Sequence, residues 1–264
     1  MSRKQTRPAI DHKAKRRAGQ GLREALTDEF YFAFYTIGGG VGFVLAGTIA
    51  FIATVGFGDR PTRMASVLIV IGMLMFAWSI WRVRRRAGRI ATGLSGEEAM
   101  GDALSALEAV GFHVLHDLPS GRRSGANVDH VVIGPTGVFA IETKARSKPA
   151  SVTPRAVFDG HGISFADGPF DSRPIEQATA CASDVSATLS ELGFPSTVRP
   201  VVSIPEWFVE TTNGHPWEHE VIVGMEKNLL TFLSYQAQPK PVISNKEIAQ
   251  ISKLLATWAE TKRT

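Results

Sequence analysis

Residues 128–144, VDHVVIGPTGVFAIETK, decide the fold of this chain because they encode two short hydrophobic strands joined by a turn. The turn at 134–137 (GPTG) has proline at its second position, which is typical of a tight turn. Closing that turn pairs Ile133 with Val138 and Val131 with Ala140. The stretch therefore predicts an antiparallel hairpin.

The same register places two carboxylates opposite each other. Side chains alternate along a strand, so Asp129 shares a face with Val131, while Glu142 and Lys144 share one with Ala140. Asp129 therefore faces Glu142 across the two strands. Facing carboxylates repel each other and cost stability unless a divalent cation lies between them. We expect Asp129 and Glu142 to bind Mg²⁺ or Mn²⁺, with Lys144 beside them.

This trio of side chains suits the hydrolysis of phosphodiester bonds. Acidic oxygens hold Mg²⁺, which stabilises charge on the scissile phosphate and acidifies a water molecule. Lys144 would orient that water or neutralise charge in the transition state. The carbonyl of Thr143 is a further candidate metal ligand.

A helix is expected before the hairpin. Residues 95–98 (SGEE) have the pattern of a capping box, which predicts a helix start at Ser95. Glu97 falls on the apolar stripe formed by Met100 and Leu104, so we select it as a second site acid. The alternative is an ordinary acid in the first turn, favoured there by the helix dipole.

A second helix is predicted to begin near Pro174 and to stop before Gly193. Gln177 is expected in its first turn, where a neutral amide can hydrogen-bond a phosphate or a metal-bound water. A solvated surface glutamine is the alternative. Cys181, on the same helix, is interpreted as a small core residue, and a single cysteine excludes an internal disulfide.

The remaining pattern indicates a mixed α/β fold, with the folded part at 95–264. The other expected elements are a hairpin on the same sheet at 156–165, strands at 198–204 and 221–223, and helices near 227–235 and 245–261.

The order of these blocks resembles the PD-(D/E)xK nuclease superfamily and, within it, the nuclease-related domain (NERD) family. The similar blocks are 96–97 (GE), 114–117 (VLHD), 129–135 (DHVVIGP), 137–139 (GVF), 141–144 (IETK) and 174–178 (PIEQA). The resemblance covers roughly 95–192. It implies a restriction-endonuclease-like sheet and a Mg²⁺-dependent nuclease with Glu97, Asp129, Glu142, Lys144 and Gln177 in its site. Residues 145–149 (ARSKP) lack the glycine-containing turn common in the family, so substrate approach is expected to differ.

Two uncharged stretches precede the folded part. Residues 30–58 are long enough to cross a hydrocarbon layer with tilt, and residues 64–81 are near the lower limit for a span. Together they predict a transmembrane helical hairpin between a basic leader (1–29) and a basic linker (82–94). A cleaved signal peptide is the alternative, but the leader is too long and a second span follows.

The distribution of charge predicts the orientation and the partners. Eight Lys and Arg residues precede the first span and five follow the second, against two between them, so both termini and the folded domain should be cytoplasmic at the inner (cell) membrane. Gly38 and Gly42 indicate either a homo-oligomer through the membrane hairpin or packing within it.

The net charge of +4 is unevenly spread. Residues 1–90 hold 15 Lys and Arg against 5 Asp and Glu, whereas residues 91–264 hold 14 against 20. The basic flanks are expected to meet anionic lipid head groups. The acidic domain weakens the case for nucleic acid, DNA or RNA, as the substrate. A local basic rim could still guide a phosphate backbone, or could serve only loop solubility; it comprises Arg122, Arg123, Lys144, Arg146, Lys148 and Arg155.

A second motif, HPWEH at 215–219, spells the H-x-x-E-H of inverted zinc proteases. Gly214 precedes it and a strand follows at once, which leaves no room for the helix that would bring both histidines together. We therefore expect a loop. Three hypotheses remain: a membrane-tethered nuclease, which we favour; a silent nuclease-fold module that binds nucleic acid or a protein; and a membrane scaffold.

Overall fold

The computed structural model describes residues 16–55, 61–121, 127–148, 153–166, 168–234 and 243–263. These residues fall into two compact units. One unit is Gly21–Leu94. The other combines Ser95–Thr264 with the described residues of Met1–Gln20.

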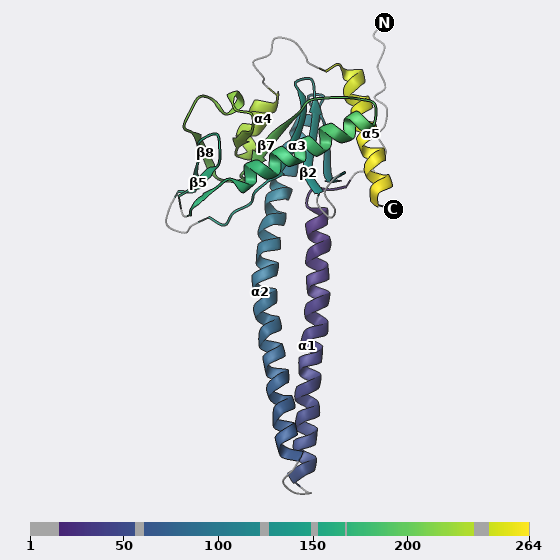
Figure 1. The fold of residues 1–264 in the computed structure, drawn as a ribbon, viewed down its shortest axis with the longest axis vertical. Helices are drawn as coiled ribbons and strands as arrows, with labels where there is room; N and C mark the ends of the chain where they lie inside the picture. Colours follow the sequence, from purple (N-terminus) through teal and green to yellow (C-terminus); the bar gives the residue numbers. More distant parts are fainter. Residues whose placement is uncertain are drawn as a thin grey trace. The chain divides into compact units, whose positions relative to one another are not determined.

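The first unit contains α1 (Gln20–Val55) and the first part of α2 (Pro61–Glu108), which run side by side (Figure 1). Their most apolar windows have mean hydropathies of 1.8 and 1.9, and large apolar side chains such as Phe34, Leu45 and Leu74 are exposed. By length and composition both helices could cross a membrane. α1 also begins ten residues before the apolar stretch at 30–58, inside the basic leader.

A buried ion-pair cluster joins these two helices at the border of their apolar stretches. The Glu29 carboxylate is buried and lies 3.0 Å from Arg82 Nε and 3.4 Å from Arg86 Nε. The Arg82 guanidinium also stacks 4.2 Å from the ring centre of Phe32 and 5.7 Å from that of Trp78. Two cations thus compensate the cost of burying one carboxylate.

Gly38 and Gly42 do not pack the hairpin internally. A Cβ added to either would meet nothing within 4 Å, whereas one added to Gly72 would lie 2.7 Å from the carbonyl oxygen of Gly40. The internal-packing interpretation of Gly38 and Gly42 is therefore wrong, because other glycines make the close helix contact. Their part in a homo-oligomer stays a prediction.

α2 continues without interruption from Pro61 to Glu108. The predicted helix start at Ser95 is therefore wrong. Residues 82–94 are themselves helical and contain no proline that would end the helix, so the capping pattern at 95–98 falls inside a longer helix.

The second unit is built on a five-stranded mixed sheet. The strand order is β1-β2-β3-β7-β9, antiparallel from β1 to β3 and parallel from β3 to β9. The bounds are β1 (His113–Pro119), β2 (Asn127–Gly134), β3 (Gly137–Thr143), β7 (Val198–Ser203) and β9 (Ile222–Gly224). The predicted register is confirmed, since Ile133 pairs with Val138 and Val131 with Ala140.

Helices cover both faces of this sheet. They are α3 (Arg173–Glu191) and α5 (Asn245–Arg263) on one face, and the end of α2 with α4 (Glu226–Ser234) on the other. Val131 of the hairpin packs with Leu189 of α3 and Leu255 of α5, and Phe139 packs on the opposite face with Leu104 of α2. The expected mixed α/β fold is confirmed. Because side chains alternate along the hairpin, its residues contribute to the hydrophobic cores on both faces of the sheet.

The second predicted hairpin exists, but it belongs to a separate sheet. This sheet has the order β6-β5-β4-β8, with β4 (Arg155–Phe158), β5 (Ile163–Phe165), β6 (Phe170–Asp171) and β8 (Phe208–Thr211). Placement on the main sheet is wrong because the free edge of β3 is taken by β7. β4 pairs instead with β8, a strand that the sequence pattern did not predict.

Candidate active site

The hairpin brings Asp129 and Glu142 together at its open end. The β2–β3 ladder ends with the pair of His130 and Ile141, and the two acids lie one residue beyond that pair. There the Oδ2 atom of Asp129 accepts a hydrogen bond of 2.7 Å from the backbone N–H of Thr143. The carboxylate of one strand is thereby fixed against the end of the other.

Lys144 is held beside Glu142. Its Nζ atom lies 2.6 Å from Glu142 Oε1, and its backbone N–H donates to the Ser203 carbonyl at 2.8 Å. The other carboxylate oxygen, Oε2, lies 3.5 Å from the Cys181 thiol of α3. The Glu142 side chain is 12% exposed and that of Lys144 is 33% exposed, so the ammonium group is oriented by the acid yet reachable by solvent.

Glu97 reaches this group of residues from α2. A Cβ added to Gly96 would lie 2.4 Å from the Cβ of Ala145, so only glycine lets the helix approach the residue that follows Lys144. Burial raises the pKa of Glu97 from 4.5 to about 7, with further contributions from the negative charges of Asp117 and Glu142. The predicted second acid is thus electrostatically coupled to the hairpin.

Asp129 lies in the same negatively charged environment as Glu97. Burial and the neighbouring carboxylates of Glu142 and Glu97 hold its pKa well above the usual value, against the opposing effects of the Thr143 N–H and Lys144. One lysine therefore does not balance the local acids. In addition, the Oγ1 atom of Thr143 is buried and has no hydrogen-bond partner in the described part of the chain.

The negative charge of these residues suits a divalent cation. Their small number suits a cation that binds few protein ligands. Among the described residues, no group of three or more His, Cys, Asp or Glu side chains is arranged to hold a metal ion. Mg²⁺ commonly binds through one or two carboxylates and keeps several waters. Asp129 and Glu142, with the Thr143 carbonyl, are the donors that this pattern leaves.

Asp117 on β1 is an acid near the site that the sequence reasoning did not select. It lies between the His116–His130 and Leu118–Val128 pairs of the β1–β2 ladder, and its charge helps to raise the pKa of Glu97. Its backbone φ of +53° departs from extended geometry, and Asn127 donates to its Oδ1 at 2.6 Å. Cross-strand pairing applied to 113–119 would have found it.

The neighbouring pair of histidines was also missed. The Nδ1 atoms of His116 and His130 lie 2.8 Å apart, so one ring donates and the other accepts. His130 is fully buried, and burial together with His116 lowers its pKa well below the usual value. This contact ties β1 to β2 next to Asp129.

Residues 92–205 match the family model described as the nuclease-related domain, NERD. The chain contains a nuclease-related domain. The resemblance read from the sequence blocks is confirmed, and the matched range includes every candidate site residue. No curated protein and no solved structure matches the chain.

In the NERD domain, Gln177 lies one helical turn before Cys181, the residue that contacts Glu142. α3 begins at Arg173, so Gln177 opens the second turn rather than standing in the first. Its side chain is exposed. Gln177 thus lies on α3, the helix that covers Glu142, and the Gln177 amide is open to solvent.

The H-x-x-E-H stretch lies outside the matched range and forms a short 3-10 turn, Pro216–Glu218, instead of an α-helix. Glu218 accepts from the backbone N–H of His215 at 2.8 Å, and the Nε2 atom of His219 lies 2.6 Å from the Asn213 carbonyl. These local contacts use the Glu218 carboxylate and one ring nitrogen of His219. The prediction that this stretch has no α-helix is confirmed.

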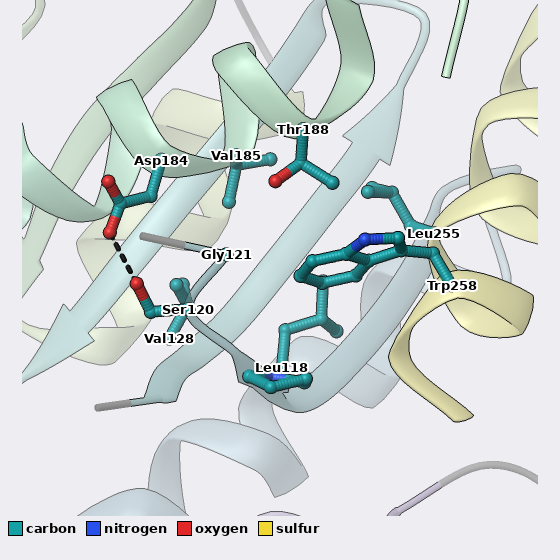
Figure 2. Close-up of a pocket in the computed structure, with 10 residues that line it drawn as sticks. Leu118, Ser120, Gly121, Val128, Asp184, Val185, Thr188, Leu255 and Trp258 are labelled. Carbon is teal, nitrogen blue, oxygen red and sulfur yellow. Dashed lines mark hydrogen bonds between the residues drawn. The ribbon is translucent and has the colours of Figure 1, made fainter. Parts of the chain in front are cut away.

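A hollow elsewhere in the second unit contains none of the predicted site residues. It lies between the ends of β1 and β2 and the helices α3 and α5, with the indole of Trp258 on one side and the Ser120 hydroxyl donating to Asp184 at 2.6 Å (Figure 2). Leu118 and Leu255 give it an apolar wall. The acid site lies instead at the open end of the hairpin.

Proposed function

We propose that the NERD domain is a metal-dependent nuclease that hydrolyses phosphodiester bonds of nucleic acid, DNA or RNA. The observation that carries the proposal is the convergence of Asp129, Glu142 and Lys144 at the end of one hairpin, with more negative charge than the lysine balances. A site of this charge suits a divalent cation and a phosphate together.

Each residue has a separate role. Asp129, Glu142 and the Thr143 carbonyl would hold Mg²⁺ or Mn²⁺, which supplies stabilisation of charge on the scissile phosphate and activation of the attacking water. Lys144, oriented by Glu142, donates hydrogen bonds to that water or to a phosphate oxygen. Glu97 has a pKa of about 7, so it can accept or release a proton near neutral pH.

Gln177 would donate from α3 to a phosphate oxygen. Its exposed amide on the helix that covers Glu142 supports this role. A neutral amide does not compete with the carboxylates for the cation.

The location of this activity is the cytoplasmic face of the cell membrane. The two apolar helices and the excess of Lys and Arg on both outer flanks support a multi-pass topology with both termini inside. The basic residues at 82–89 would lie at anionic lipid head groups. Nucleic acid cut by this domain would therefore be processed next to the membrane.

A second candidate function is a NERD module that binds nucleic acid or a protein partner without turnover. One observation favours it: residues 91–264 carry 20 acidic against 14 basic side chains. An acidic domain attracts phosphate only where a metal or a local basic rim reverses the field.

The test is a cleavage and binding assay on the full chain in detergent. Labelled single- and double-stranded DNA and RNA are incubated with Mg²⁺, Mn²⁺ or EDTA. We expect cleavage that EDTA stops and that Lys144→Ala abolishes, whereas Lys253→Ala, an exposed lysine on α5, has no effect. Binding without cleavage would support the silent module, and neither binding nor cleavage would leave only a scaffold.

A further inference from the structure

The basic leader contacts the NERD domain just before α1 begins. Arg16 Nη1 lies 3.0 Å from Asp117 Oδ2, and the two side chains are only 16% and 8% exposed. A buried pair of this kind is costly to separate, because removing one partner leaves an uncompensated charge. The leader is thus anchored at one defined point rather than merely lying near an acidic surface.

Two further contacts continue along the leader toward Glu97. A Cβ added to Gly101 of α2 would lie 2.4 Å from the Cβ of Ala18, so the glycine makes room for the leader against the helix. Gly19 is buried, and its backbone N–H donates to the Glu97 carboxylate. We call Arg16, Ala18 and Gly19, the three residues that make these contacts, the leader strap.

The anchor of the leader strap is itself firmly held. Asn127 at the start of β2 donates to the Asp117 side chain at 2.6 Å, and Arg263 of α5 donates to the Asp117 carbonyl. Asp117 therefore connects the leader strap with the hairpin that carries Asp129 and with the C-terminal helix.

We propose that the leader strap is a working part of the active site and that Arg16 is a positioning residue, which anchors the strap at Asp117 so that the strap holds Glu97 against the hairpin. This inference rests on the proposed nuclease function for its catalytic consequence, and on the contacts above for its structural part. Arg16 pairs with Asp117, so it acts on the site through Asp117 and the strap.

The leader strap also connects the site to the first apolar helix, because α1 starts at Gln20 directly after Gly19. The position of Glu97 then depends on a segment that continues directly into α1, a helix that could cross a membrane. A fragment that begins after the apolar helices would lack Arg16 and Gly19. Such a fragment should be a weaker enzyme than the full chain even when it folds.

The first experiment compares Arg16→Gln, Arg16→Lys and Arg17→Gln in the full chain. Arg17 is exposed and adjacent, so its variant makes the same change in net charge without touching Asp117. Hydrogen–deuterium exchange of the peptide covering 16–22 measures docking of the leader strap, and kcat and KM on the cleaved substrate measure positioning. We expect Arg16→Gln to speed exchange about tenfold and to lower kcat about tenfold at unchanged KM. Arg16→Lys should recover part of both effects, and Arg17→Gln should match the wild type.

Gly101→Ala supplies a second perturbation that alters no charge. Alanine raises helix propensity, so α2 itself should not weaken, while the new Cβ occupies the space of Ala18. We expect the same faster exchange of 16–22 and the same loss of kcat. An unchanged exchange rate in both Arg16→Gln and Gly101→Ala would overturn the docking of the strap, and a raised kcat would overturn positioning in favour of inhibition.

The exchange measurement needs no substrate, so it separates the two proposals. If the wild-type chain cleaves nothing, the proposed function fails while faster exchange in the variants still supports the strap. If the wild type cleaves and Arg16→Gln behaves like Arg17→Gln in both measurements, the strap fails while the nuclease stands.

Discussion

Replacing Glu97 by glutamine is expected to stabilise the folded domain at alkaline pH and to leave its stability nearly unchanged at pH 5. The folded-state pKa of Glu97 is about 7, above the value of 4.5 expected for the unfolded chain. Between these values the unfolded chain binds fewer protons than the folded one, so stability falls as pH rises through this window. The loss is complete above pH 7 and absent below pH 4.5.

The size of the effect follows from that pKa difference. For a fully buried group, this difference corresponds to about 3 kcal/mol. Glu97 is only half-buried, so solvent screening reduces the cost of its charge to about 1–2 kcal/mol. Glutamine keeps an oxygen that can accept from the Gly19 N–H and removes the charge. A gain of this size should raise the melting temperature by about 3–6 °C at pH 8.

The measurement is thermal unfolding of the full chain in detergent with EDTA, at pH 5 and pH 8. Asp102→Asn is the matched control, because it removes one exposed negative charge from the same helix. The reasoning would be refuted if Glu97→Gln and Asp102→Asn gave equal shifts at pH 8. An equal shift of Glu97→Gln at both pH values would refute it as well, because the charge of Glu97 would then not be its cause.

Three further outcomes are expected. Mn²⁺ at one hundred times its Kd should stabilise the full chain by about 2.7 kcal/mol at pH 8; calorimetry should show no such gain in Asp129→Asn, and an equal gain would remove Asp129 from the metal donors. Gly134→Ala would place a Cβ 1.9 Å from the Phe112 ring, so chemical denaturation should show a loss of about 1–3 kcal/mol, and an unchanged midpoint would mean that the ring moves freely. Thr62→Cys in sealed cells should react with an impermeant maleimide added outside. The natural cysteine, Cys181, is buried and should add little background labelling. Labelling only after permeabilisation would reverse the topology.

Much of the site followed from local patterns in the sequence. The proline turn set the register of the hairpin, and the period of two then placed Asp129, Glu142 and Lys144 on one face at one end. These are properties of neighbouring residues along two short strands, so a single sequence is enough to establish them. The expected helices at the C-terminal end and the strand at 198–204 rest on the same kind of local periodicity.

Other features depended on which segments bury each other, and no local pattern contains that information. The pattern at 95–98 reads as a helix start, but the preceding segment stays helical, so α2 runs through Ser95. The hairpin at 156–165 joins a second sheet because β7 already occupies the edge of β3. Only the tertiary structure brings Arg16 to Asp117 and Gly19 to Glu97, since a charged leader gains order from long-range contacts and not from its own composition.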